Sequence, residues 1–545
     1  MISFSARPMS ESGNPARSAP ELTLDREFCR RACDARDARF DGLFFIAIVT
    51  TGIYCRPVCP ARRVPLHRCR FFPTAAASEE AGFRPCMRCR PELAPGRATV
   101  DAVPRLAAMA SVRIAEGALN GRSIDELATE FGVCARQLRR AVKHELGVTP
   151  TELAQTHRLL LAKQLLTDTR MTVSRVAFAS GFQSLRRFNA LFRQRYRINP
   201  LALRRRRAGA AEASAAAGDD LLLRLSYRPP LAWDELLRAL RQRAIPGVEQ
   251  VDATGYRRTV RIGADTGIVG VEVRSDSRGP AVGGPPLQLR ISATLLPSVM
   301  ALLPRTRALL DLDAEPELID AHLRKAGLAP LVDRRPGLRV PGSFDAFETA
   351  LRVLLEHTDE AHAVPRKLAR LAEHWGEPIA SAESPLARLF PTASRLAEVD
   401  AGSIEAQNPG EGLGEAIVAI SRLIATGRLR LGPGADPALA IAVLDECLRA
   451  AVRSGPSTPA LAETIARRAM SWPDSFDDKD ESLAIEATAC VSSESTQRTI
   501  ESWRPWRAYA GLHLWFAAAD RLPGDGVEPI RETREANSEA LAAIS

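Results

Sequence analysis

Two closely spaced pairs of cysteines place the tightest constraint on how the front of this 545-residue chain can fold. They are Cys55-x-x-x-Cys59 and Cys86-x-x-Cys89, and 26 residues separate the pairs. The sequence has no apolar run long enough to cross a membrane and no secretory leader, so we expect a reducing, cytoplasmic location. Paired thiols there favour a metal over a disulfide. Four thiolates predict a tetrahedral Zn²⁺ site that stabilises a domain with little core of its own.

The surroundings of the cysteines leave two roles open for the metal. Four-cysteine zinc sites are usually structural clips, but zinc also keeps its ligands as thiolates, the nucleophilic form of cysteine. Six arginines suited to phosphate oxygens flank the pairs: Arg56, Arg62, Arg63, Arg84, Arg88 and Arg90. The apolar residues 43–49 predict a buried strand before the first pair. The other cysteines are interpreted as packing residues: Cys29, Cys33, Cys69, Cys134, Cys447 and Cys490.

The net charge of +9 is unevenly distributed along the chain. Basic residues outnumber acidic ones over residues 1–207, and acidic residues outnumber basic ones over residues 208–545. A basic front part attached to an acidic remainder predicts that a polyanion, double-stranded DNA, binds to the front part.

Two similar helical patterns follow one another within the basic part, over residues 123–143 and 172–195. In each, a Ser or Thr is placed to cap a short helix, a glycine ends that helix, and an arginine-rich second helix follows. The caps and glycines are Ser123, Gly132, Thr172 and Gly181. The pattern predicts two helix-turn-helix motifs bridged by a long helix near 150–166.

Such a pair of motifs can enter successive segments of the major groove without a dimer, so we expect a monomer. The candidate DNA contacts are Arg136, Gln137 and Arg140 in the first motif and Gln183, Ser184, Arg186 and Arg187 in the second. Each of them is as well suited to phosphate as to a base, because most protein–DNA contacts are to the backbone. Four apolar residues of the second motif are interpreted as core: Phe178, Phe188, Leu191 and Phe192.

Composition and periodicity divide the chain into seven segments. We expect a disordered start (1–20), a zinc-binding domain (21–98), a double helix-turn-helix (99–207), a linker (208–220), a β-rich domain (221–297), a helical domain (298–523) and a loose tail (524–545). In the β-rich domain, strands are expected near 221–227, 259–262, 267–273 and 287–295, with a helix near 233–243. The predicted fold class is multidomain α+β: a small α/β zinc domain, an all-α module, a β-rich domain and an all-α domain.

The segments around the cysteines resemble the metal-binding domain of the Ada family of methylation-damage sensors. The resemblance rests on residues 50–62 and 81–89, which contain Gly-Ile-Tyr-Cys-Arg-Pro-Val-Cys and Gly-Phe-Arg-Pro-Cys-Met-Arg-Cys. It implies that Cys55 irreversibly accepts a methyl group from a methylated DNA phosphate, that the other three cysteines of the pairs complete the zinc site, and that Arg62 faces phosphate. The Pro-Cys-His-Arg active site of a second methyl-accepting domain is absent from the sequence, so repair of methylated guanine oxygen is not expected.

Electrostatics explains how methyl acceptance can become a signal. Four thiolates and one divalent ion carry a net charge of −2, which repels an anionic phosphodiester but not a neutral methyl phosphotriester. Methylation of one thiolate lowers that charge to −1. The affinity of the adjacent basic surface for DNA should then rise.

Residues 179–200 resemble the signature of AraC-type transcription activators, and residues 105–205 as a whole fit that two-motif module. The resemblance implies that the protein activates transcription from a promoter, with RNA polymerase as a partner.

The second half resembles the AlkA type of 3-methyladenine DNA glycosylase, a branch of the helix-hairpin-helix superfamily. Residues 502–515 look like its closing helix, residues 340–348 like the opening of its catalytic domain, and residues 221–297 are similar to its amino-terminal domain. Such enzymes flip an alkylated base into an aromatic pocket and use one carboxylate. The resemblance implies Asp480 as this carboxylate and Trp515 as a pocket aromatic.

Other parts of that family pattern are missing. Gly455-Pro-Ser-Thr-Pro459 replaces a Gly-x-Gly turn whose amides grip phosphate, and proline has no amide hydrogen. Ala460 and Thr464 stand where the family has Trp and Tyr, and 356–358 replace Gly-Gln-Gln at the base-flipping wedge. Because flipping needs electrostatic hold on DNA, these changes and the acidic charge predict a glycosylase fold with weak or no activity.

Two alternatives to this damage-responsive regulator remain open. In the first, Asp480 still works and the protein also excises alkylated bases. A solvated acidic loop that also contains Asp474, Asp477 and Asp478 explains Asp480 equally well. In the second, the zinc is purely structural.

Overall fold

The computed structural model describes residues 26–37, 40–61, 64–95, 105–207, 220–274, 285–358, 362–383, 385–407, 413–432, 434–451, 458–476 and 496–521. Several predictions of the sequence fall outside these ranges: Arg62, Arg63, Asp477, Asp478, Asp480, Cys490, the start at 1–20, the linker up to 219 and the tail from 524. Among the described residues, no helix combines the length and the apolar character needed to span a bilayer.

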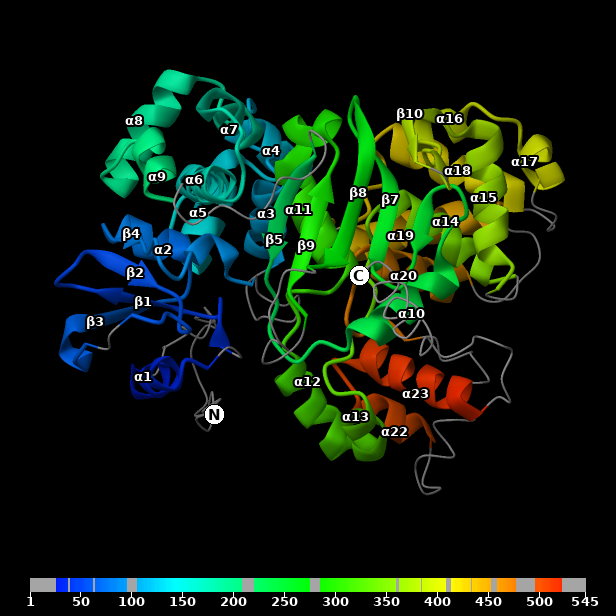
Figure 1. Ribbon diagram of the computed structural model, residues 1–545. Coiled ribbons are helices and arrows are strands. Elements are labelled where there is room, and N and C mark those ends of the chain that lie inside the picture. The colour runs from blue at the N-terminus through cyan, green and yellow to red at the C-terminus, as the bar shows by residue number, and fades with distance from the viewer. Residues whose placement is uncertain are drawn as a thin grey trace, which may run out of the picture.

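The front of the chain forms a small sheet flanked by two helices, at the left of Figure 1. The strands lie in the order β3-β1-β2-β4, and β1 confirms the predicted strand over a shorter range. The bounds are α1 Arg26–Ala35, β1 Phe45–Ile48, β2 Ile53–Cys55, β3 Cys69–Phe72, α2 Ala75–Glu80 and β4 Arg84–Pro85. Cys29, Cys33 and Cys69 are buried in its core, as predicted.

Seven helices follow, and they confirm the predicted pair of helix-turn-helix motifs. Ser123 and Thr172 accept hydrogen bonds from Glu126 N and Arg175 N, while Gly132 and Gly181 have φ of 65° and 82°. The bounds are α3 Arg105–Ala115, α4 Ile124–Glu130, α5 Ala135–Leu146, α6 Pro150–Asp168, α7 Val173–Ala179, α8 Leu185–Tyr196 and α9 Pro200–Arg207.

An antiparallel five-stranded sheet with the order β5-β9-β8-β7-β6 opens the second half and lies at the centre of Figure 1. The predicted helix is found as α10 Trp233–Arg243, whereas β6 has no counterpart in the prediction and the end of the last predicted strand is a 3₁₀ helix. The strands are β5 Leu221–Leu225, β6 Glu249–Val251, β7 Gly255–Ile262, β8 Asp265–Val273 and β9 Leu287–Ile291.

The described residues after β9 are helical except for one hairpin, β10 Pro378–Glu383 and β11 Leu386–Arg388, which the helical prediction missed. The helices are α11 Val299–Leu309, α12 Pro316–Leu323, α13 Ala329–Arg334, α14 Ala346–Glu356, α15 Val364–Trp375, α16 Ala393–Ala397, α17 Ala401–Gln407, α18 Leu413–Ala425, α19 Pro437–Ala451, α20 Thr458–Ala469, α22 Thr496–Ser502 and α23 Arg507–Arg521. The predicted multidomain α+β class is confirmed.

The two halves share one hydrophobic core. Leu165 of α6 and Phe192 of α8 belong to the same buried cluster as Leu223 of β5 and Leu289 of β9. Across this contact, Gln164 Nε2 donates to the backbone oxygen of Arg224 at 3.2 Å. The helix-turn-helix module is therefore packed on the sheet of the second half.

Candidate functional site

The four predicted metal ligands come together in the folded chain. Their sulfur atoms all lie within 4.8 Å of one another, and all four residues are buried. Strands β2 and β4 pair in parallel, and Cys86 N donates to Tyr54 O at 2.9 Å, which sets the second cysteine pair beside the first. Cys55 ends β2 and is 7% exposed.

The donor set fits Zn²⁺. Hydrogen bonds among the four sulfurs raise the pKa of Cys55 and Cys89 and lower that of Cys59 to about 7 and that of Cys86 further. Sulfur atoms this close cannot all be anionic unless a cation offsets their repulsion. A soft, closed-shell divalent ion meets this demand with tetrahedral thiolate ligands.

Two of the flanking arginines are not free to bind phosphate, contrary to the sequence interpretation. Arg56 Nε donates to Asp41 Oδ1 at 2.8 Å, and its Nη1 donates to Cys89 O at 3.2 Å. Arg90 is buried and pairs with Glu92 at 3.0 Å and Asp168 at 2.6 Å. Both guanidinium groups are engaged in hydrogen bonds and ion pairs within the protein. The other two described arginines differ from them: Arg84 is half-buried and Arg88 is exposed.

Two buried carboxylates tie the metal-binding domain to the helix-turn-helix module. Glu79 of α2 accepts from Tyr54 Oη at 2.9 Å and from Thr156 Oγ1 of α6 at 3.0 Å. Glu92 pairs with Lys163 of α6, whose ammonium also donates to Cys86 O at 3.0 Å. Sequence reasoning missed both networks, because isolated Glu and Lys residues give no periodic signal.

The predicted DNA contacts lie in two exposed groups at the starts of α5 and α8: Arg136, Gln137 and Arg140, and Gln183, Ser184, Arg186 and Arg187. Two of them also close helix ends. Gln137 Oε1 accepts from Cys134 N at 3.1 Å, and Ser184 Oγ accepts from Arg187 N at 3.4 Å. The side chains of Gln137 and Ser184 therefore cap the starts of α5 and α8 as well as facing solvent.

Two packing predictions in this module are wrong. Phe188 and Phe192 are fully buried, but Phe178 is 55% exposed, because it lies on the outer face of the short helix α7. Cys134 is also exposed, because it is the N-cap of α5, where the chain enters the helix from the surface.

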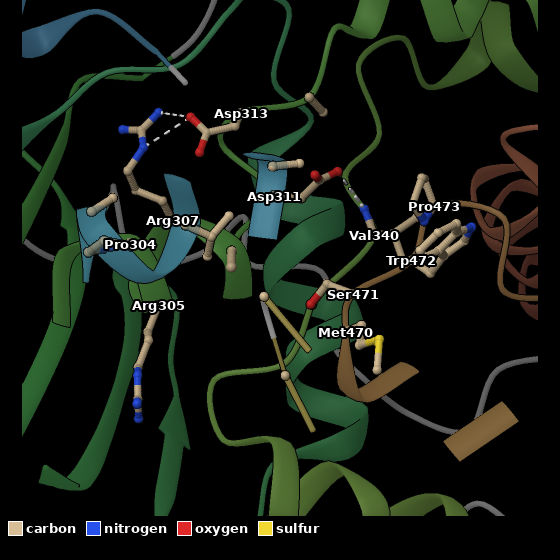
Figure 2. Close-up of a pocket in the computed structure, with 18 of the residues that line it drawn as sticks. Pro304, Arg305, Arg307, Asp311, Asp313, Val340, Met470, Ser471, Trp472 and Pro473 are labelled. Atoms are coloured by element: carbon tan, nitrogen blue, oxygen red, sulfur yellow. Dashed lines mark hydrogen bonds and ion pairs between the residues drawn. The ribbon is translucent and has the colours of Figure 1, made fainter. Parts of the chain in front are cut away.

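A cavity of about 1530 Å³ lies between the front part and the second half. Trp515 of α23 lines it together with Trp472 and Tyr509, and so do Met109 and Val112 of helix α3. Figure 2 shows Trp472 beside Met470, Ser471 and Pro473. The cavity thus has aromatic walls from the second half and an apolar wall from α3.

One of the carboxylates that line this cavity is Asp311, which sequence reasoning missed. Asp311 Oδ2 accepts from Tyr509 Oη at 2.6 Å and from Val340 N at 3.4 Å, and Figure 2 shows the second contact. Burial raises the pKa of the Asp311 carboxyl to about 6. Its partner Tyr509 lies on the same helix as Trp515, so the bond fixes one cavity wall.

Asp474 does not belong to a solvated acidic loop. It is buried and pairs with Arg507 at 2.9 Å and with Arg504. The ion pair with Arg507 joins the loop after α20 to the start of α23. The correction concerns Asp474 alone, because its acidic neighbours lie outside the described residues.

Ion pairs also link the first helix-turn-helix motif and the segment before it to the second half. Arg305 of α11 lies 3.7 Å from Glu116, the residue that follows α3, and Arg430 lies 3.4 Å from Glu130 of α4. Two arginines of the second half are thus paired with carboxylates of the helix-turn-helix module.

Comparison with known families gives three matches along the chain. Residues 28–92 match the metal binding domain of Ada, residues 127–206 a helix-turn-helix domain, and residues 222–345 the AlkA N-terminal domain.

Three relatives span different parts of the chain. The "Probable bifunctional transcriptional activator/DNA repair enzyme AlkA" of Mycobacterium tuberculosis is 36% identical over 90% of this chain and 96% of its own length. DNA-3-methyladenine glycosylase 2 of Escherichia coli is 29% identical over 54% of this chain and 96% of its own. The bifunctional transcriptional activator/DNA repair enzyme AdaA of Bacillus subtilis is 28% identical over 34% of this chain and 84% of its own.

Proposed function

The chain belongs to the family of bifunctional transcriptional activators and DNA repair enzymes that join an Ada-type metal-binding domain, a helix-turn-helix domain and an AlkA-type half, and we propose that it accepts a methyl group from DNA methyl phosphotriesters on Cys55 and then binds promoter DNA. The observation that carries the proposal is the buried four-sulfur cluster in a domain that shares ion pairs with the helix-turn-helix module. In this proposal the partners are double-stranded DNA and RNA polymerase. The protein is proposed to act as a monomer in the cytoplasm.

The methyl transfer needs no proton movement at Cys55. The sulfur of the Cys55 thiolate forms a bond to the methyl carbon, the bond from that carbon to the phosphate oxygen breaks, and the phosphotriester becomes an anionic phosphodiester. A bound Zn²⁺ supplies stabilisation of the thiolate form. Arg56 N donates to Cys89 Sγ at 3.4 Å, which helps fix the neighbouring ligand, and Arg62 is proposed to face the phosphate.

Transfer of the methyl group is stoichiometric, because a thioether does not return it to DNA. Loss of one negative charge from the cluster then lowers its repulsion of DNA phosphates. The two exposed groups on α5 and α8 are proposed to bind the promoter. The seven segments expected from the sequence, with a linker at 208–220, remain the proposed domain boundaries.

A mass measurement tests the methyl acceptor. After incubation with duplex DNA that contains methyl phosphotriesters, we expect one methyl group on the peptide that contains Cys55 and none on the peptide that contains the exposed Cys134. Cys55→Ser should abolish the transfer, whereas the control Cys134→Ser should keep it. Unmodified Cys55 in zinc-loaded protein would overturn the proposal.

For the AlkA-type half, we propose that base excision is weak or lost, with Trp515 and Asp480 as remnants of a base pocket. In support, Ala460 is exposed and Thr464 half-buried on α20, where the sequence pattern of glycosylases has aromatics, and α3 supplies a wall of the cavity that Trp515 lines. A flipped base would have to enter beside that helix.

An excision assay tests this second proposal. Duplex DNA that contains 3-methyladenine should release no base above the uncatalysed background, and Asp480→Asn should give the same result as the unmodified protein. Release that disappears in the Asp480→Asn variant would show an active glycosylase and reverse the assignment.

A further inference from the structure

Among the described residues, the two cations that donate to backbone oxygens of the metal ligands are each matched by a buried carboxylate. Arg56 donates through Nη1 to Cys89 O, and Lys163 donates through Nζ to Cys86 O at 3.0 Å. Each of these two donors places a full positive charge at the backbone oxygen of a cysteine ligand, close to the cluster. Left unpaired, each would cancel part of the negative charge that four thiolates leave on one divalent ion.

Asp41 neutralises Arg56. Its carboxylate accepts from both Nε and Nη2 of the guanidinium, a bidentate pair in which the two side chains are 12% and 5% exposed. The backbone oxygen of Asp41 accepts from Nε of Arg228, which is fully buried in the second half. The loop that carries Asp41 is thus fixed from two sides.

Lys163 is neutralised in the same way within a group of four charges. Glu92 pairs with Lys163 and Arg90, and Asp168 pairs with Arg90 at 2.6 Å. Two cations and two carboxylates leave this group without net charge. Both charged donors are therefore paired with carboxylates, so neither of them reduces the net negative charge around the sulfurs.

From this pairing we infer that Asp41 is a specificity-determining residue of the methyl sensor: it cancels the charge of Arg56, so that the metal cluster keeps its full negative field and repels ordinary phosphodiesters. The inference rests on the proposed function and explains how a sensor with a cation next to its acceptor still discriminates against undamaged DNA. Removal of the Asp41 charge alters the local field by the same one unit as methylation of Cys55.

The test compares zinc-loaded, unmethylated full-length variants for binding to an undamaged duplex of mixed sequence at low salt. Asp41→Asn should bind roughly threefold to tenfold more tightly than the unmodified protein, because it leaves Arg56 uncompensated beside the cluster. Asp34→Asn is the matched control, since it removes the same charge from a side chain on α1 that is 45% exposed and pairs with Arg30. It should stay within about twofold of the unmodified protein.

A double variant separates charge from shape. Asp41→Asn with Arg56→Gln restores neutrality and should return the affinity to within about twofold of the unmodified protein, whereas Arg56→Gln alone should weaken binding. If Asp41→Asn binds no more tightly than Asp34→Asn, or if the double variant keeps the gain, the inference is overturned. Should Asp41→Asn fail to retain zinc, Arg56→Gln decides, and unchanged binding by it refutes the inference.

The result is separable from the proposed function. If Cys55 of the unmodified protein takes up a methyl group and its DNA affinity then rises, the sensor stands whatever Asp41→Asn does. If the unmodified protein shows neither effect, the function fails and a gain in Asp41→Asn reports only local electrostatics.

Discussion

At the scale of single residues, several carboxylates form contacts with distant segments that the sequence alone does not reveal. Asp41, Glu79, Glu92 and Asp311 each accept hydrogen bonds from side chains or amides of another segment of the chain. The zinc cysteines were predictable because their spacing is itself a ligand pattern. A buried Asp or Glu in an irregular segment has no such spacing, and only the fold reveals its partner.

The raised pKa of Asp311 gives a pH dependence of stability. Burial raises this pKa to about 6 from its ordinary value of 3.8, so the folded protein binds the proton more tightly than the unfolded chain. The contribution of Asp311 to the free energy of unfolding is therefore fully present below about pH 4 and is lost as the pH rises towards 6.

Asp311→Asn should remove this dependence, because an amide oxygen still accepts from Tyr509 and Val340 but cannot ionise. At pH 7 we expect the free energy of unfolding of the variant to exceed that of the unmodified protein by at most about 3 kcal/mol, so the variant should melt at a higher temperature. This difference should disappear near pH 4. Thermal melts at both pH values check the prediction. A gap that is independent of pH would show that Asp311 does not titrate in this window.

At the scale of helices and strands, the sequence predicted most where the local signals agree. Ser123 precedes the start of α4 and Gly132 follows its end, as expected. Both signals are local, because a capping side chain and a glycine with positive φ each affect the backbone within one turn of the helix. The hairpin of β10 and β11 was missed, because its short strands lie between helices and pair only with each other. Phe178 was misplaced for a related reason: helical spacing shows which residues share a face but not whether a neighbour covers it.

At the scale of the whole molecule, the two halves are joined by more than the expected linker. The core that contains Phe192 and Leu223, the cavity lined by Met109 and Trp515, and the guanidinium of Arg228 all bridge them. Sequence reasoning placed the family segments in the right order but treated the halves as separate, because contacts across 60 or more residues, such as that of Gln164 with Arg224, leave no periodic trace.

Arg228 offers a direct test of this union. It is fully buried and donates to Asp41 O at 3.1 Å and to Asp313 O at 2.5 Å, so Arg228→Met removes a donor from each of these two carbonyl oxygens. We expect a loss of about 2–4 kcal/mol in the free energy of unfolding and faster proteolytic separation of the halves.

Arg238→Met is the control, because this arginine of α10 is 43% exposed and its ion pair with Asp520 spans 3.7 Å. It should change the free energy of unfolding by no more than about 0.5 kcal/mol and leave the proteolysis rate unaltered. Equal behaviour of the two variants would show that the contact of Arg228 with Asp41 does not hold the halves together.

The anchorage of the Asp41 loop by Arg228 has an evolutionary consequence. A domain that supplies an inner support of its neighbour stays under natural selection for that support, whatever becomes of its own chemistry. Mutations would then accumulate first at positions that served only excision, while the side chains that face the sensor resist drift. A lineage could in this way lose an enzyme and still keep its architecture.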